Sequence, residues 1–172
     1  DGKVIQQPST HLLGQNFSKP FDVKFKDKDG SDKYCYLTCY GPAISRIFAS
    51  LISVHGDDNG LIFPFKIAPF QIVIVPVLIK GKEKEVLKKA KELQKKLAEK
   101  FRTYLDLREE NMGEKFYHWE MKGIPIRLEL GPKEVKSSEV TLFRRDTQKK
   151  EKVKLKDLFK KIEKIGEDLT KN

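Results

Sequence analysis

Apolar residues recur along most of the chain with the period of a strand or of a helix, and they predict its elements. A near-continuous apolar run over 71–79 is typical of a central strand that is buried on both faces. An apolar stripe from Val86 to Leu97 predicts a helix over 82–101. Further strands are predicted at 103–107, 124–130 and 138–146, a helix capped by Asn111 over 113–121, and a closing helix with apolar positions from Leu155 to Leu169.

The order of these elements from about residue 69 onward determines the expected fold class. It runs β-α-β-α-β-β-α, with no internal repeat. Helices that connect parallel strands make right-handed crossovers and cover the sheet. An α/β fold with a mixed sheet is therefore expected.

The region before residue 66 shows a less regular pattern. Residues 21–26 alternate like a half-buried strand, Asp29-Gly30 is typical of a hairpin tip, and 34–40 is expected to return as a second strand. Helical spacing then predicts a helix from Ala43 to His55, which ends at a glycine. The next segment is interrupted by Gly and Pro, and we place a domain boundary there, between residues 65 and 66.

Charge adds a class of partner to this picture. The formal net charge is +10, which favours a polyanion: nucleic acid first, and a membrane surface second. Part of the excess lies in 80–100, where a solvated lysine-rich helix face is the alternative explanation. No apolar run is long enough for a transmembrane helix. Two cysteines give no disulfide framework, so a reducing, cytoplasmic location is expected.

Familiar catalytic and metal-binding motifs are missing. There is no Walker loop, no dinucleotide fingerprint and no nucleophile–base pair. Cys35 and Cys39 share one face of a predicted strand without further ligands nearby, so we expect two buried, inert thiols and no metal site.

Arg46 is a candidate anion ligand, because it lies in the first turn of the helix that follows a strand. Free N–H groups at a helix start favour an anion, and a guanidinium beside them can hold a phosphate with two parallel hydrogen bonds. An arginine that is paired with a nearby carboxylate is the alternative.

A second candidate is a basic and aromatic face in the region after residue 66. Single-stranded RNA is bound by stacking on aromatic rings and by hydrogen bonds to base edges. A solvated sheet edge is the alternative. The residues of this face would be Arg127, Lys133, Arg144 and Arg145, with Tyr117 and Phe143 nearby.

At these residues the sequence closely resembles the prolyl-tRNA synthetases, class II aminoacyl-tRNA synthetases of the archaeal and eukaryotic type. The resemblance covers nearly the whole chain. "CYGPAISR" resembles motif 3, although Thr38 and Ala43 stand where that motif usually has glycines. The other matching stretches are "QQPSTHLLGQNFSKPFDV", "HGDDNGLIFPFKIAPFQIVIVPV", "GIPIRLELGPKEV" and "VTLFRRDT".

The resemblance implies two domains. Residues 1–65 would be an antiparallel strand-helix fragment of a class II catalytic domain that includes motif 3. Residues 66–172 would be the class II anticodon-binding domain, with a mixed five-stranded sheet flanked by three helices. Motifs 1 and 2 and the C-terminal zinc-binding extension are not in this sequence. We therefore expect a fragment that does not activate proline by itself.

Site residues also follow from the resemblance. Arg46 would bind the ATP phosphates, Gln6 and Ser9 would contact ATP, and His11 would belong to the proline pocket. Anticodon guanines would be read by the strand "IRLEL" and the loop "GPKEV", because carboxylates accept from the N1–H and N2–H₂ edge of guanine while cations hold O6 or phosphate. The implied anticodon-binding residues are Arg127, Glu129, Lys133, Glu134 and Arg145.

The full-length enzyme would activate L-proline with ATP, in complex with Mg²⁺, and transfer it to tRNA(Pro). It would work as a cytoplasmic homodimer with no membrane partner. Two alternatives remain open. The chain could be a free-standing RNA-binding module without aminoacylation activity, or part of a sister synthetase for threonine, glycine or histidine, against which "THLLGQNF" argues.

Overall fold

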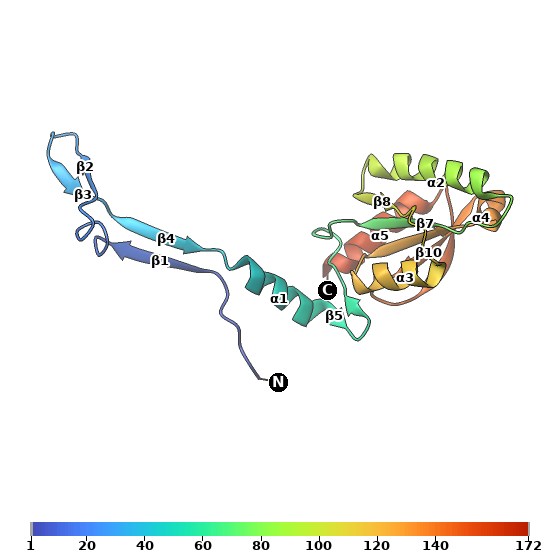
Figure 1. The fold of residues 1–172 in the computed structure, drawn as a ribbon, viewed down its shortest axis with the longest axis horizontal. Helices are drawn as coiled ribbons and strands as arrows, with labels where there is room; N and C mark the ends of the chain where they lie inside the picture. Colours follow the sequence, from blue (N-terminus) through green and yellow to red (C-terminus); the bar gives the residue numbers. More distant parts are fainter. Residues whose placement is uncertain (1, 172) are drawn as a thin grey trace. The chain divides into compact units, whose positions relative to one another are not determined.

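A computed structural model describes residues 2–171 (Figure 1). The chain divides into two compact units, one up to Val54 and the other from His55 onward. Each unit is described by itself below.

The second unit is built on a five-stranded mixed sheet with the order β11-β10-β9-β7-β8. β7 pairs in parallel with β8 and with β9, whereas β10 pairs antiparallel with β9 and β11. The mixed five-stranded sheet that we expected is thereby confirmed. Its strands are β7 (Ile72–Pro76), β8 (Thr103–Leu105), β9 (Ile126–Leu130), β10 (Glu139–Arg144) and β11 (Lys150–Lys154).

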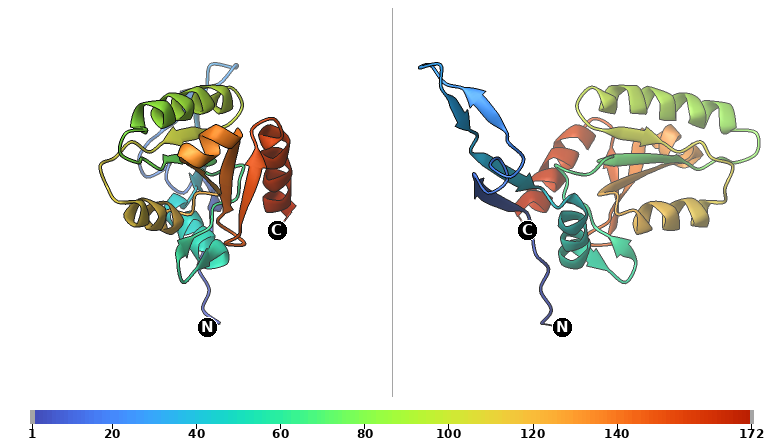
Figure 2. Two further views of the ribbon diagram at one scale, coloured as in Figure 1. Left: turned by 90° about the vertical axis from the view of Figure 1, so that its right-hand side faces the viewer. Right: turned by 60° about the vertical axis from the view of Figure 1, so that its left-hand side comes forward.

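Helices cover the two faces of this sheet unequally, as the two views of Figure 2 show. Alternate residues of β7 enter different clusters: Ile72 and Ile74 pack with α2, α4 and α5, whereas Val73 and Val75 pack with α3. Among the described residues, one face therefore carries three helices and the other carries α3 alone. These helices are α2 (Glu83–Ala98), α3 (Met112–Met121), α4 (Pro132–Ser137) and α5 (Leu158–Lys171).

A small hairpin precedes the sheet and belongs to the second unit. It consists of β5 (Gly56–Asp57) and β6 (Gly60–Leu61). The hairpin lies against the end of α3, where Gly123 has a φ of +71° and a Cβ atom would collide with the carbonyl of Leu61. The division between the two units, after Val54, comes eleven residues before our domain boundary at 65/66, but a compact unit need not coincide with a domain of the whole protein. That boundary therefore stays a prediction.

The first unit is a pair of two-stranded sheets followed by a helix. β1 (Ser9–Gly14) pairs antiparallel with β4 (Leu37–Gly41), and β2 (Lys24–Lys26) with β3 (Asp32–Tyr34). The single returning strand that we expected over 34–40 is therefore two strands with different partners. α1 (Ile44–His55) follows β4.

The cysteines differ from our expectation. Cys39 is exposed and Cys35 is only partly buried, in the break between β3 and β4. The prediction of two buried thiols was wrong. Among the described residues of the first unit, no second layer packs on either face of the two-stranded sheets that β3 and β4 help to form.

Among residues 2–171, none of the helices combines the length and the apolar character that a membrane crossing requires.

Candidate nucleic-acid interface

On the side of the sheet that carries α3, the described residues place no helix over β10 and β11. α3 packs over β7 and β8. Trp119 and Phe116 of the helix belong to one apolar cluster with Val73, Val75 and Tyr104 of these strands. Beyond it, Arg127 of β9, Phe143 of β10 and Lys150 of β11 lie opposite one another in register. This cross-strand row forms the centre of the candidate interface.

Arg127 is enclosed at the centre of this row and is only 3% exposed. Its guanidinium lies between two aromatic rings, 3.9 Å from the centroid of Phe116 and 4.2 Å from that of Phe143. Its nitrogens donate to Glu120 at 2.6 Å and to Glu129 at 3.0 Å. A planar guanidinium suits this double stacking with in-plane hydrogen bonds, which a lysine could not reproduce.

Charges of alternating sign extend from Arg127 toward solvent. Glu129 also accepts from Lys150, 2.9 Å away, and the Lys150 ammonium lies 5.0 Å from the ring centroid of Phe116. The side chains become more accessible along this series: Glu129 is 12% exposed, Glu120 29% and Lys150 47%. Partly accessible carboxylates with lone pairs to spare can accept hydrogen bonds from a base edge, beside a ring on which the base can stack.

The other predicted anticodon residues lie elsewhere in the second unit. Lys133 is exposed at the start of α4, just beyond the carboxyl end of β9. Glu134 accepts from the backbone N–H of Gly131 at 3.2 Å and so caps that helix. Arg145 is 1% exposed, and its guanidinium is paired with Asp57 of the hairpin.

That ion pair leaves Arg145 no free donor edge for a nucleic acid. The hydrogen bonds from Arg145 are the largest reason why the pKa of Asp57 is lowered, to about 2. Arg144 is likewise paired, with Asp146 at 2.8 Å and Asp168 at 3.4 Å. Both arginines therefore have a structural function in this chain.

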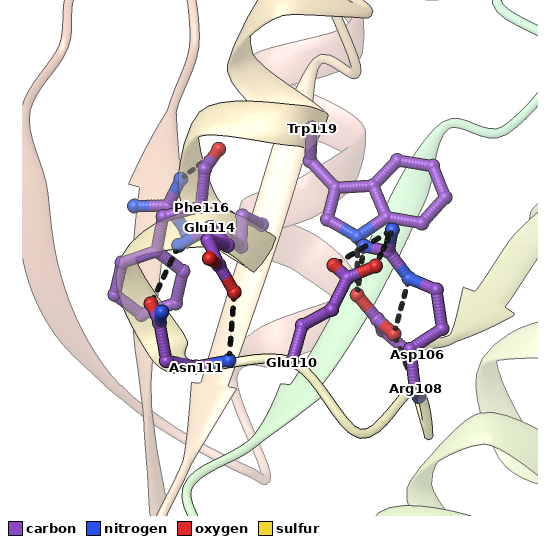
Figure 3. A network of polar contacts seen from close by, with 8 residues as sticks. Asp106, Arg108, Glu110, Asn111, Glu114, Phe116 and Trp119 are labelled. Carbon is purple, nitrogen blue, oxygen red and sulfur yellow. Dashed lines mark hydrogen bonds and ion pairs between the residues drawn. The ribbon is translucent and has the colours of Figure 1, made fainter.

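A polar network fixes α3 (Figure 3). This helix supplies Phe116 and Glu120 to the interface. Asp106 lies just after β8 and is fully buried. It accepts from the indole nitrogen of Trp119 at 2.7 Å and from two guanidinium nitrogens of Arg108 at 2.8 and 3.0 Å. Burial alone would raise the pKa of this carboxyl, but the hydrogen bonds outweigh burial and lower the pKa to about 2.

The start of α3 is held by a reciprocal cap. The side chain of Asn111 accepts from the backbone N–H of Glu114 at 3.0 Å, and the carboxylate of Glu114 accepts from the N–H of Asn111 at 3.2 Å. Two of the helix's otherwise unpaired N–H groups are thus satisfied, as in a capping box. The cap that the sequence predicted at Asn111 is confirmed.

The predicted ATP and proline residues all lie in the first unit. Ser9 and His11 share one face of β1, with the Ser9 hydroxyl 3.0 Å from Nε2 of His11. Gln6 is exposed in the segment that precedes this strand. Arg46 is partly buried in the first turn of α1, and its guanidinium has no carboxylate partner among the described residues. The alternative of a locally paired arginine is thereby not supported.

Ala43 connects β4 to this helix with a φ of +49°, in the left-handed region. A residue with a side chain is strained in that conformation. The strain gives a physical reason for the glycine that motif 3 usually has at this place.

Sequence reasoning missed three members of the interface: Phe116 and Glu120 of α3, and Lys150 of β11. Their i, i+4 spacing places Phe116 and Glu120 on one helix face, but only the packing of α3 beside β9 directs that face toward Arg127. Lys150 lies in a lysine-rich stretch that has no apolar alternation. No three or more potential metal ligands cluster together in the part of the chain that the structure describes.

Comparison with known proteins adds a family to this geometry. Residues 71–165 match the family described as "Anticodon binding domain". The chain is 52% identical over 172 residues to a protein of Thermofilum pendens named "Proline--tRNA ligase". The matched stretch covers 98% of this chain and 36% of that relative. Proteins of the same name from Methanocaldococcus jannaschii and Methanococcus maripaludis are each 46% identical, covering 100% and 96% of this chain. The chain spans little more than a third of these relatives, 36–38% of their length.

Proposed function

Because this chain belongs to the anticodon binding domain family, we propose that its second domain reads the anticodon of a tRNA and that the whole protein is a prolyl-tRNA synthetase. The observation that carries the proposal is the near-complete match of both regions, over 96–100% of the chain, to proteins named "Proline--tRNA ligase". A free-standing RNA-binding module would not need the region that contains Arg46.

The geometry supports a division of labour for anticodon reading. Glu120 and Glu129 would accept hydrogen bonds from the N1–H and N2–H₂ groups of a guanine, while the ring of Phe116 offers a stacking surface. Lys133 and Lys150 would hold phosphate or guanine O6. Arg127, which is enclosed, would act by positioning the two carboxylates.

The first region would belong to the catalytic domain. Arg46 would hold the ATP phosphates, Gln6 and Ser9 would contact ATP, and His11 would line the proline pocket. The proline carboxylate would attack the α-phosphorus and release pyrophosphate, and the terminal ribose hydroxyl of tRNA(Pro) would then attack the prolyl carbonyl and release AMP. Mg²⁺ would enter with the substrate ATP, and the whole protein would be a cytoplasmic homodimer.

The role of Arg46 can be tested in the full-length protein. Arg46→Ala should lower proline-dependent pyrophosphate exchange on the order of 10²-fold, because a key charge that stabilises the transition state is lost. Arg102→Ala, which removes an arginine of the second unit, should leave exchange within about twofold if the protein stays folded. Exchange near the normal rate in the Arg46 variant would remove this residue from the phosphate role.

Anticodon reading predicts a different pattern of loss. Glu129→Gln and Lys133→Gln should each lower the charging of tRNA(Pro) by about tenfold or more, since a charge-assisted contact contributes about 1.5–3 kcal/mol. Pyrophosphate exchange without tRNA should remain normal. Glu151→Gln, on the opposite face of β11, is the matched control. Equal loss of both activities would indicate misfolding rather than impaired recognition.

A further inference from the structure

A cavity of about 570 Å³ opens at the carboxyl ends of β7 and β8, away from the Arg127 row. Its walls come from the end of β7 and the residues after it, from the loop 106–112 after β8, from Lys115 of α3, and from one side of α2. The volume is that of a small-molecule site.

The position of this cavity follows from the topology. The chain leaves β7 toward α2 on one face of the sheet and leaves β8 toward α3 on the other, so the two loops diverge. In sheets with parallel strands, such a switch point opens a crevice outside the carboxyl ends of the strands, and ligands bind there.

Lys115 is the unusual residue of the cavity wall. It is only 5% exposed, yet its ammonium forms no hydrogen bond or ion pair with the described residues. Every fully enclosed side-chain nitrogen and oxygen that the structure describes has a hydrogen-bond partner. Because the Lys115 ammonium has none, it is not fully enclosed and must reach open space. The cavity is the open space that Lys115 lines. An ammonium with three donors in a nearly enclosed site needs an acceptor from outside the protein.

Three cations and three carboxylates line the cavity, so its formal charge is balanced, but the pairing among these groups is uneven. Lys91 of α2 lines it and has no partner among the described residues. Arg108 is already neutralised by Asp106 and Glu110, 2.8 and 2.9 Å away. Two ammonium groups thus face a single unpaired carboxylate, that of the exposed Glu109.

The rest of the wall is apolar and firmly held. Leu78, Leu87 and Met112 supply an apolar surface beside the two lysines. The loop that carries Arg108 is fixed by the network of Asp106 and Trp119 seen in Figure 3. A site whose polar groups are preorganised loses little entropy when a ligand binds.

We propose that this cavity binds the phosphate group of a phosphate ester, with Lys115 and Lys91 on the phosphate oxygens and the organic part against Leu78, Leu87 and Met112. A dianionic phosphate matches two point-charge ammonium groups better than a carboxylate does. The site is separate from the Arg127 row and does not depend on anticodon reading. Its ligand is a free nucleotide or a nucleotide unit of bound RNA, which share this chemistry.

Calorimetric titration of the 172-residue chain with AMP tests the proposal, and Trp119, the only tryptophan, gives a second optical signal. Lys115→Met keeps the length and apolar stem of the side chain and should weaken AMP binding at least tenfold. Lys96→Met, on α2 but outside the cavity wall, should change it less than twofold. Equal weakening by both variants would overturn the site, as would acetate binding as tightly as AMP.

Lysine acylation followed by mass spectrometry tests the same site in the unaltered chain, so the answer does not depend on whether Lys115→Met folds. Protection of Lys115 and Lys91, but not of Lys96, by AMP identifies a free nucleotide as the ligand. The same protection by a tRNA anticodon stem-loop, without protection by AMP, identifies a nucleotide unit of RNA. If neither probe protects Lys115, the proposal is wrong. Glu129→Gln should not alter the protection by AMP, which separates this result from failure of the proposed function.

Discussion

Asp106 shows at the level of one residue how burial and hydrogen bonding compete. A buried carboxylate is costly unless its lone pairs are occupied. Here Trp119 and the Arg108 side chain and backbone N–H occupy them, so the charged form is favoured inside the protein. The same carboxylate anchors α3 through the indole and thereby determines where Phe116 and Glu120 lie.

A pH dependence of stability follows. The pKa of Asp106 is about 2 in the folded chain, below about 3.9 for an unfolded aspartate. Its contribution is therefore fully present above about pH 5 and is lost as the pH falls toward 2, an effect of about 2 kcal/mol. Urea unfolding followed by Trp119 fluorescence should show Asp106→Asn to be less stable than the unaltered chain at pH 7. The difference in unfolding free energy between the two proteins should become smaller toward pH 2.

Asp58→Asn provides the control for this measurement, because Asp58 is exposed and has no partner among the described residues. Its unfolding free energy should follow that of the unaltered chain at every pH. If the difference in unfolding free energy between Asp106→Asn and the unaltered chain stays constant with pH, the Asp106 carboxylate is not the titrating group.

At the scale of elements, the β5–β6 hairpin attaches to the end of α3 by close backbone contact and to Arg145, just after β10, by one ion pair. Asp57 pairs with Arg145 next to β10, and the backbones at Gly60 and Gly123 approach Met121 and Leu61 too closely to leave room for a Cβ atom. Glycine at these positions is therefore a condition for the docking of the hairpin.

Two alanine substitutions separate this docking from backbone strain. Gly123→Ala should lower the unfolding free energy by more than about 2 kcal/mol, since it adds a collision with Leu61 to the left-handed strain of about 1–2 kcal/mol. Gly81→Ala is the matched control: its φ is +88°, but open space surrounds it, so only the strain remains. Equal losses in urea unfolding would show that close packing at Gly123 contributes nothing.

The elements also show what the sequence could and could not predict. β7, α2 and β9 were predictable because each buries an apolar pattern of the right period. β11 was missed because its five residues include a single apolar one, Val153, and its pairing with β10 comes from tertiary context. α4 has only six residues, too few to show a helical period.

The candidate interface was predictable only in part, because local pattern identifies residues of one strand but not the contacts made by tertiary packing. Arg127 and Glu129 could be named from a strand motif, whereas their coupling to Phe116 and Glu120 depends on how a helix lies on the sheet. Local pattern also could not show that Arg145 is buried, since its partner Asp57 is far away in sequence.

At the scale of the whole molecule, the two units differ in what they bury. Every buried apolar residue among those described belongs to the second unit, and α1 has no buried residue at all. The first unit instead exposes large side chains such as Leu12, Tyr36 and Ile44. Hydrophobic burial is the main favourable contribution to folding, so the units should differ greatly in stability.

Amide hydrogen exchange on the 172-residue chain should reveal this difference. Amides of β1, β4 and α1 should exchange with little protection, whereas those of β7 and β9 should approach the protection set by global unfolding. The measurement is exchange by NMR or mass spectrometry at neutral pH. Similar protection in both units would show that the first unit is stabilised by contacts other than apolar burial.

The central place of β7 has a consequence for how the chain folds during synthesis. All five residues of β7 are buried, and one of its two neighbours, β9, starts only at Ile126, fifty residues beyond Pro76. At about 5–20 residues per second, the ribosome leaves this edge unpaired for seconds, long enough for chains to associate. The lysine-rich helix α2 is made during that interval, and its positive charge opposes contact between nascent chains until β9 emerges.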